Sequence, residues 1–107
     1  MMDALMSPQR ATRVIPFRVS SAGAVLEGSQ HITVTKGATG IYSITLLVAS
    51  ARVPVMMGLT GSAAGVARYG TASVTGFASM VFETDAGTDT DTEFHGCIMA
   101  FDAADER

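Results

Sequence analysis

The sequence predicts an all-β fold: a single antiparallel β-sandwich or jelly-roll-like domain of about seven to eight short strands. Short runs of β-branched and other apolar residues alternate with connections rich in Gly, Thr and Ser. After the first eleven residues, no stretch carries the apolar stripe of an amphipathic helix. With 107 residues, 48% of them hydrophobic, the chain is long enough to bury one core.

Residues 1–11 are expected to form an N-terminal arm, and residues 12–107 the β domain. The arm has a few apolar residues without a sustained period, although one helical turn over residues 3–6 is an alternative. The first strand is expected from Thr12. Pro16 would restrict it to an edge, a bulge or an unpaired extended segment, because proline has no N–H to donate. A short strand should follow around residues 25–26.

The clearest local element is a β-hairpin in residues 31–47. Apolar side chains recur at every second position of both arms: Ile32 and Val34, then Tyr42, Ile44 and Leu46. Residues 36–40 connect the arms. The glycines near both ends of this connection can supply the positive φ that tight turns need.

Four further segments complete the predicted sandwich. Residues 52–60 form a strand with Pro54 near its start, and Gly58 marks a bulge or a close contact. Residues 66–69 and 73–84 give two strands, separated by a turn at Gly70 and Thr71. In the second of these strands, alternation predicts one face with Phe77, Ser79 and Val81 and the opposite face with Ala78, Met80 and Phe82.

Residues 85–92 read as a polar loop, because Asp, Gly and Thr offer the backbone local hydrogen bonds. Residues 93–101 then form the last strand. Both of its faces are largely apolar, so we expect both to be covered. The adjacent methionines Met56 and Met57 point to opposite faces of their strand. One would fill the core, and the other could serve an interface, although core filling alone also explains such residues.

Composition limits the classes of partner. The net charge of −3 and the scattered Lys and Arg residues argue against nucleic-acid binding. Only 16% of residues are charged, which suggests that copies of the chain or a partner cover some apolar surface. Basic residues concentrate early and acidic residues late. This polarity could steer neighbouring subunits together, or both sets could be ordinary solvated positions.

Cysteine usage and hydropathy bear on the compartment. Cys97 is the only cysteine, so no intrachain disulfide can form and we expect folding in a reducing cytoplasm. The first ten residues lack the pattern of a signal peptide, and no run approaches the roughly 18 apolar residues of a membrane span. We therefore expect neither secretion nor membrane insertion.

Two groups of residues are candidate metal ligands. Asp85, Asp89, Asp91 and Glu93 could offer oxygens to Ca²⁺, but their spacing fails the helix-loop-helix calcium pattern, so a solvated acidic loop is the favoured interpretation. His95 and Cys97 would share one strand face, and His31 could join them. They lack the closely paired ligands of structural zinc sites. We predict no metal or cofactor site.

No catalytic constellation is recognisable. A nucleophile such as Cys97 or a serine needs a base and an orienting acid, and no GxSxG elbow surrounds any serine. Residues 58–65 are glycine-rich but lack the GK[ST] ending of a phosphate-binding loop. We therefore expect a protein that is not an enzyme.

The order of motifs resembles β domains of tailed-bacteriophage head-fibre, capsid decoration and tail-fibre proteins. The resemblance covers about residues 30–101 and is carried by the following segments: 35–46, 52–57, 74–77 and 91–98. In that group a GTGxY hairpin precedes an xxPVV strand and a final DxxFxF strand. Leu46 stands where the group often has Phe, and Cys97 and Ile98 replace a more aromatic ending.

The resemblance implies a virion structural protein, a decoration (cement) protein or short head fibre that binds the major capsid protein or other virion proteins. Such domains look like compact sandwiches that commonly form trimers. Residues 1–20 would be the attachment arm. The protein would be located on the capsid exterior and would be assembled into particles in the host cytoplasm. The alternative is a receptor- or glycan-binding module of a phage tail or fibre, using loops 61–65 and 85–92. This alternative is weakened because few rings are available to stack on sugars: the chain has no Trp and two Tyr.

Overall fold

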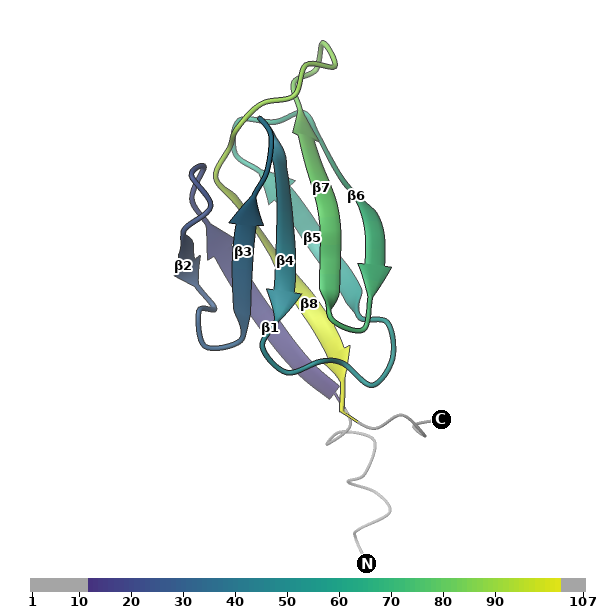
Figure 1. Ribbon diagram of the computed structural model, residues 1–107. Coiled ribbons are helices and arrows are strands. Elements are labelled where there is room, and N and C mark those ends of the chain that lie inside the picture. The colour runs from purple at the N-terminus through teal and green to yellow at the C-terminus, as the bar shows by residue number, and fades with distance from the viewer. Residues whose placement is uncertain (1–11, 103–107) are drawn as a thin grey trace, which may run out of the picture.

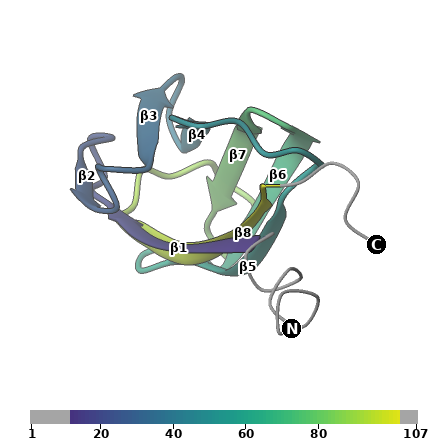
Figure 2. The same cartoon turned by 90° about the horizontal axis from the view of Figure 1, so that it is seen from below.

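The computed structural model describes residues 12–102, which form two four-stranded antiparallel sheets packed face to face (Figures 1 and 2). The strands are β1 (Thr12–Val19), β2 (Val25–Glu27), β3 (Ile32–Lys36), β4 (Ile41–Leu46), β5 (Val55–Gly61), β6 (Val66–Ser73), β7 (Gly76–Glu83) and β8 (Phe94–Phe101). One sheet has the order β2-β1-β8-β5 and the other β3-β4-β7-β6. The all-β sandwich predicted from the sequence is confirmed. Residues 1–11, the predicted arm, lie outside the described residues, as do residues 103–107.

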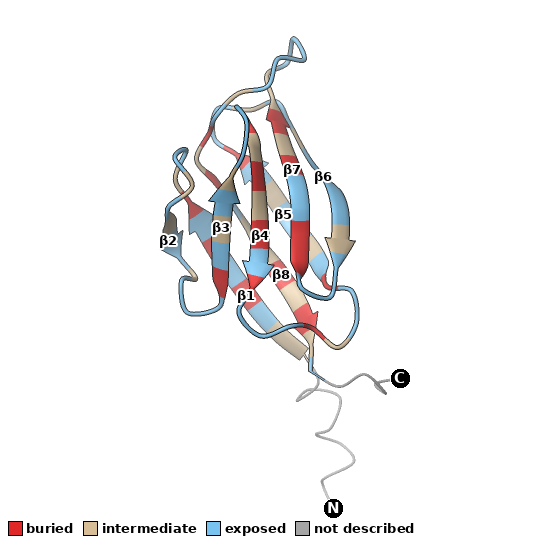
Figure 3. Ribbon diagram, viewed as in Figure 1, coloured by how far each residue is buried: buried red, intermediate tan, exposed pale blue. Residues whose placement is uncertain are grey.

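The core lies between the sheets, and strands β1, β4, β7 and β8 supply all of its buried hydrophobic side chains except Ile32 of β3 (Figure 3). Its centre is an aromatic cluster in which Tyr42 and Phe82 pack on Phe94, with ring centroids 4.8 and 4.7 Å away. The remaining core members are mainly aliphatic: Ile15, Phe17, Val19, Ile32, Ile44, Leu46, Phe77, Met80, Ile98 and Ala100. Burial of these side chains is the main stabilising contribution.

The β3–β4 hairpin forms as predicted, with Ile32 paired to Leu46 and Lys36 to Tyr42. Of its two glycines, only Gly40 has a positive φ, of 74°. A Cβ on Gly40 would lie 2.7 Å from the Thr90 nitrogen, so the turn packs directly on the β7–β8 loop. Glycine is therefore required here for space as well as for conformation.

Pro16 lies within β1, paired in register with Cys97 of β8. On the other side, β2 pairs only with Arg18 and Val19, so β1 has one neighbour at the proline, as expected of an edge position. Residues 12–19 are thus an integral strand. The expectation that residues 1–20 form an attachment arm is wrong for this part, because β1 supplies buried side chains to the core.

The β6–β7 region differs from the prediction. β6 runs through Gly70 and Thr71 without a turn, and the chain reverses at residues 74–75 instead. Gly76, with φ of 144°, follows this turn. A Cβ on Gly76 would lie 2.0 Å from the Ile44 carbonyl oxygen, so only glycine fits where β7 meets β4 at this position.

A bulge in β7 also changes the predicted faces. Ser79 has a φ of 56°, and the β4–β7 register shifts at this point. The extra residue moves the alternation by one position. Phe77, Met80 and Phe82 therefore all face the core, whereas simple alternation had put Phe77 on the face opposite the other two.

β5 begins at Val55, after a buried Pro54, and so starts later than predicted. The expected bulge is present: Gly58 has a φ of 65°, and the register against β8 shifts between Met57 and Thr60. Met56 packs against the core, whereas Met57 faces outward. The two methionines thus lie on opposite faces of the sheet.

The expectation that both faces of β8 are covered is wrong within one chain. Phe94, Ile98 and Ala100 are buried between the sheets. The alternate residues His95, Cys97, Met99 and Phe101 lie on the outer face and are partly or fully exposed. No second layer of the described chain packs on this face, because the sandwich has only two sheets.

Candidate functional site

The strongest candidate for an attachment site is one end of the sandwich, here called the base. It consists of the β4–β5 loop (47–54) and the β6–β7 turn (74–75), beside the start of β1 and the end of β8 (Figure 1). Large apolar side chains project from it: Leu47, Val48, Val53 and Val74 are 53, 64, 52 and 40% exposed. Both ends of the described chain lie at this base, since Thr12 pairs with Phe101.

Hydrogen bonds hold the base loop in place. The Arg13 guanidinium donates to the carbonyl oxygens of Val48 and Ala49 at 3.2 and 3.3 Å and forms an ion pair with Asp102. The Ser50 hydroxyl accepts the Phe101 N–H at 2.9 Å. Because its backbone polar groups are bonded inward, the loop presents its apolar side chains to solvent in a fixed arrangement.

The turn is tied to the same loop. The Ser50 N–H donates to the Val74 carbonyl at 2.7 Å, and the Leu46 N–H donates to the Thr75 carbonyl at 2.8 Å. The base is therefore a single surface built from segments about 25 residues apart in sequence. Sequence reasoning missed it. The available signal was Leu46-Leu47-Val48, a run of three apolar residues that breaks the period of two at the end of a strand.

The opposite end, here called the tip, carries the acidic loop between β7 and β8. Asp91 accepts hydrogen bonds from the Gly40 N–H at 2.7 Å and the Lys36 ammonium at 3.1 Å, and these two donors lower the pKa of its carboxyl. Glu93 pairs with Arg18 at 3.4 Å. These two carboxylates thus bind the β7–β8 connection to the β3–β4 hairpin and to β1, an alternative to metal coordination.

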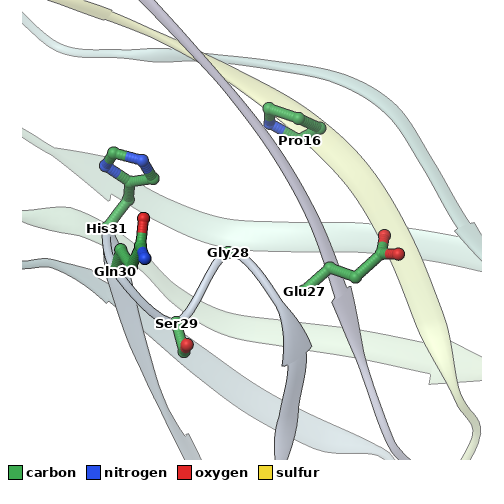
Figure 4. Close-up of a pocket in the computed structure, with 6 residues that line it drawn as sticks. All are labelled: Pro16, Glu27, Gly28, Ser29, Gln30 and His31. Atoms are coloured by element: carbon green, nitrogen blue, oxygen red, sulfur yellow. The ribbon is translucent and has the colours of Figure 1, made fainter.

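The candidate metal ligands do not converge. Within residues 12–102, no three His, Cys, Asp or Glu side chains are grouped so that they could hold a metal ion. His95 and Cys97 share the outer face of β8, as their spacing predicted. His31 lies instead in the β2–β3 connection, beside an open hollow of about 430 Å³. Figure 4 shows Glu27 and His31 on opposite sides of this hollow, with Gly28 between them.

A second hollow, of about 480 Å³, lies between the two loops suggested for ligand binding. Residues 62–65 and 84–86 line it, so the structure brings these loops together. The Gly65 N–H donates to the Glu83 carbonyl at 2.8 Å, and Asp85 lies against Gly65. The lining contains hydroxyls and a carboxylate but no aromatic ring on which a sugar could stack.

The outer face of the β1-β8-β5 sheet is a second apolar surface. Six side chains form its apolar centre in two rows: Val14, Met99 and Val55, then Pro16, Cys97 and Met57. The rows on either side are Thr12 with Phe101, and Arg18 with His95 and Thr60. The outer face of the other sheet differs in character, since hydroxyl residues dominate it: Thr33, Thr35, Ser43, Thr45, Thr71 and Ser79. We call the first surface the outer apolar face.

Comparison with known proteins identifies no relative: no protein-family model, curated protein or solved structure matches the chain. Residues 12–102 include no helix long and apolar enough to cross a membrane.

Proposed function

We propose that this chain is a virion structural protein, a capsid decoration (cement) protein or short head fibre, that binds the capsid surface through its base and self-associates. The observation that carries the proposal is the collection of Leu47, Val48, Val53 and Val74 at the base. Exposed apolar side chains gathered on one surface are typical of protein interaction sites. The partner is the major capsid protein or another virion protein.

The two ends of the sandwich support this orientation. The apolar side chains of the base lie at the same end of the sandwich as Thr12 and Phe101. The tip carries Asp85, Asp89 and Asp91 on exposed backbone and would face solvent. In this proposal the location is the exterior of the capsid, assembly takes place in the host cytoplasm, and the oligomer is a trimer. The role is binding and requires no catalytic residue.

The direct test is binding to particles. Leu47→Asp and Val48→Asp place a carboxylate on the base while leaving the core unchanged, because both side chains are exposed. Each should weaken binding to purified phage particles by about 10-fold or more, since a buried unpaired charge costs about 2 kcal/mol or more. Co-sedimentation measures the effect, and Thr88→Asp at the exposed tip is the matched control. Equal binding by all four proteins would refute the proposal.

A receptor- or glycan-binding module is the second candidate. The hollow between residues 62–65 and 84–86 favours it, because the polar atoms there could accept and donate hydrogen bonds. A glycan array probed with the purified protein tests this function. Binding that Asp85→Ala abolishes would favour the module, and an array without signal would remove it.

A further inference from the structure

We propose that the outer apolar face is the surface through which copies of this chain associate, with β8 lying beside the symmetry axis. The occupant of the face is a second copy of the same chain. This inference rests on the proposed function, which requires self-association, and it assigns that association to a surface distinct from the base.

The first argument is the composition of the face. Val14, Val55 and Met57 are 61, 46 and 36% exposed, and the other three members are Pro16, Cys97 and Met99. None of the six side chains is charged, and together they cross three neighbouring strands without interruption. A continuous apolar sheet face resembles half of a sandwich core, since stacked sheets bury such faces at a spacing of about 10 Å.

The second argument is the contrast within the molecule. Both sheets use one face for the common core, so solvent would meet both outer faces of a monomer. The outer residues of the β3-β4-β7-β6 sheet are mainly the hydroxyl-bearing ones expected there, such as Thr33, Ser43 and Thr45, whereas the two middle rows of the other sheet are apolar. The residues of β8 instead alternate between two apolar faces, the pattern of a strand covered on both sides. In the proposed assembly, a second copy of the chain covers the outer apolar face.

The third argument concerns the edges of the same sheet. A sheet can also associate by pairing edge strands, but both edges here are blunted. β2 has three residues, the part of β1 that β2 leaves unpaired carries Pro16, and β5 carries the Gly58 bulge that shifts its register. Association through the face is therefore favoured over strand addition.

The fourth argument is self-complementarity. The side chains of β1 and β5 on the two sides of β8 are similar in kind: Val14 and Val55 flank Met99, and Pro16 and Met57 flank Cys97. Around an axis parallel to β8, the β1 side of one copy meets the β5 side of the next, in a twofold or a threefold arrangement alike. Val14 would then contact Val55 of the neighbouring copy.

A standard interface takes about 800 Å² from each partner, which is about one seventh of the accessible surface of 5840 Å².

The test is oligomeric state measured by light scattering and sedimentation. The wild-type protein should have the mass of two or three chains. Met99→Arg at the centre of the face should weaken association by on the order of 100-fold, because it buries an unpaired charge. Val14→Lys, at the most exposed position, should do the same with less effect on folding. Thr45→Arg on the opposite outer face is the matched control and should remain multimeric.

Two results would overturn the inference: a wild-type monomer at every concentration, or multimers that persist in folded Met99→Arg and Val14→Lys. The arrangement has its own test in a Cys97→Ala background. A short bismaleimide should link Val14→Cys to Val55→Cys copies in a mixture more strongly than either variant to itself. Preferential linking of like to like would contradict the arrangement.

The outcomes separate this inference from the proposed function. Wild-type multimers that Met99→Arg dissociates but that do not bind particles would support the face and refute the virion role. Monomeric Met99→Arg that still binds particles would support both, with the base and the face acting separately.

Discussion

At the scale of single residues, Tyr42 connects the core to the tip. Its ring is fully buried, and its hydroxyl donates to the Ser21 carbonyl at 2.6 Å and accepts the Thr92 N–H at 3.3 Å. Burial raises the pKa of this hydroxyl. The period of two placed Tyr42 on the core face. Its partners could not be predicted, because they belong to loops 21 and 50 residues away.

Tyr42→Phe should destabilise the protein by about 1–2 kcal/mol, because it leaves the Ser21 carbonyl and the Thr92 N–H without this partner. Chemical denaturation measures the change. Tyr69→Phe, at a residue that is 42% exposed, is the control and should be nearly neutral. Equal stability of Tyr42→Phe and wild type would show that the hydroxyl does not hold the tip loops.

Asp91 gives the tip a pH dependence. Its pKa lies below the usual value of 3.8 because the Gly40 N–H and the Lys36 ammonium stabilise the carboxylate. A lowered folded-state pKa gives stability that is complete above pH 3.8 and is lost as pH falls through the folded value.

Asp91→Asn should therefore lower the Tm at neutral pH, and the difference from wild type should shrink well below pH 3.8. Thermal unfolding at both pH values provides the measurement. Asp85→Asn is the control on the same loop, because no ion pair of Asp85 is found within residues 12–102. A difference from wild type that stays constant with pH would contradict this account.

At the scale of elements, the strands with strict alternation and the Gly58 bulge were predictable, but the turn between β6 and β7 and the Ser79 bulge were not. The β3–β4 hairpin followed from alternation and one Gly-bearing turn. In residues 66–83, a turn was predicted at Gly70 and Thr71, whereas the actual turn comes just before Gly76, where the contact of Gly76 with β4 requires a glycine. The Ser79 bulge depends on the same β4–β7 register, which no local pattern specifies.

Gly76→Ala should destabilise the protein by about 3 kcal/mol or more, because a Cβ would overlap the Ile44 carbonyl oxygen and φ is 144°. Gly58→Ala is the matched control. It also has a positive φ, but its Cβ would meet nothing within 4 Å, so the cost should be about 1 kcal/mol. Equal losses of Tm in the two variants would contradict the importance of this contact.

At the scale of the whole molecule, the fold class was predictable and the interaction surfaces were only partly so. The suggestion that Met57 serves an interface agrees with its outward position, and low charge suggested covered apolar surface. The order of strands was not predictable, since it depends on pairings such as β1 with β8 that join opposite ends of the sequence. Without that order, neither the base nor the outer apolar face could be recognised.

The central claim is that the base attaches the protein to a particle and the tip faces away. Thiol labelling on particles tests it most directly, using Val53→Cys at the base and Thr88→Cys at the tip, each in a Cys97→Ala background. In free protein both positions are exposed, so both thiols should react with maleimide. On purified particles the account predicts that the Val53→Cys thiol is protected and the Thr88→Cys thiol still reacts. Equal labelling of both thiols, protection of the tip, or absence of the protein from the particles would contradict it.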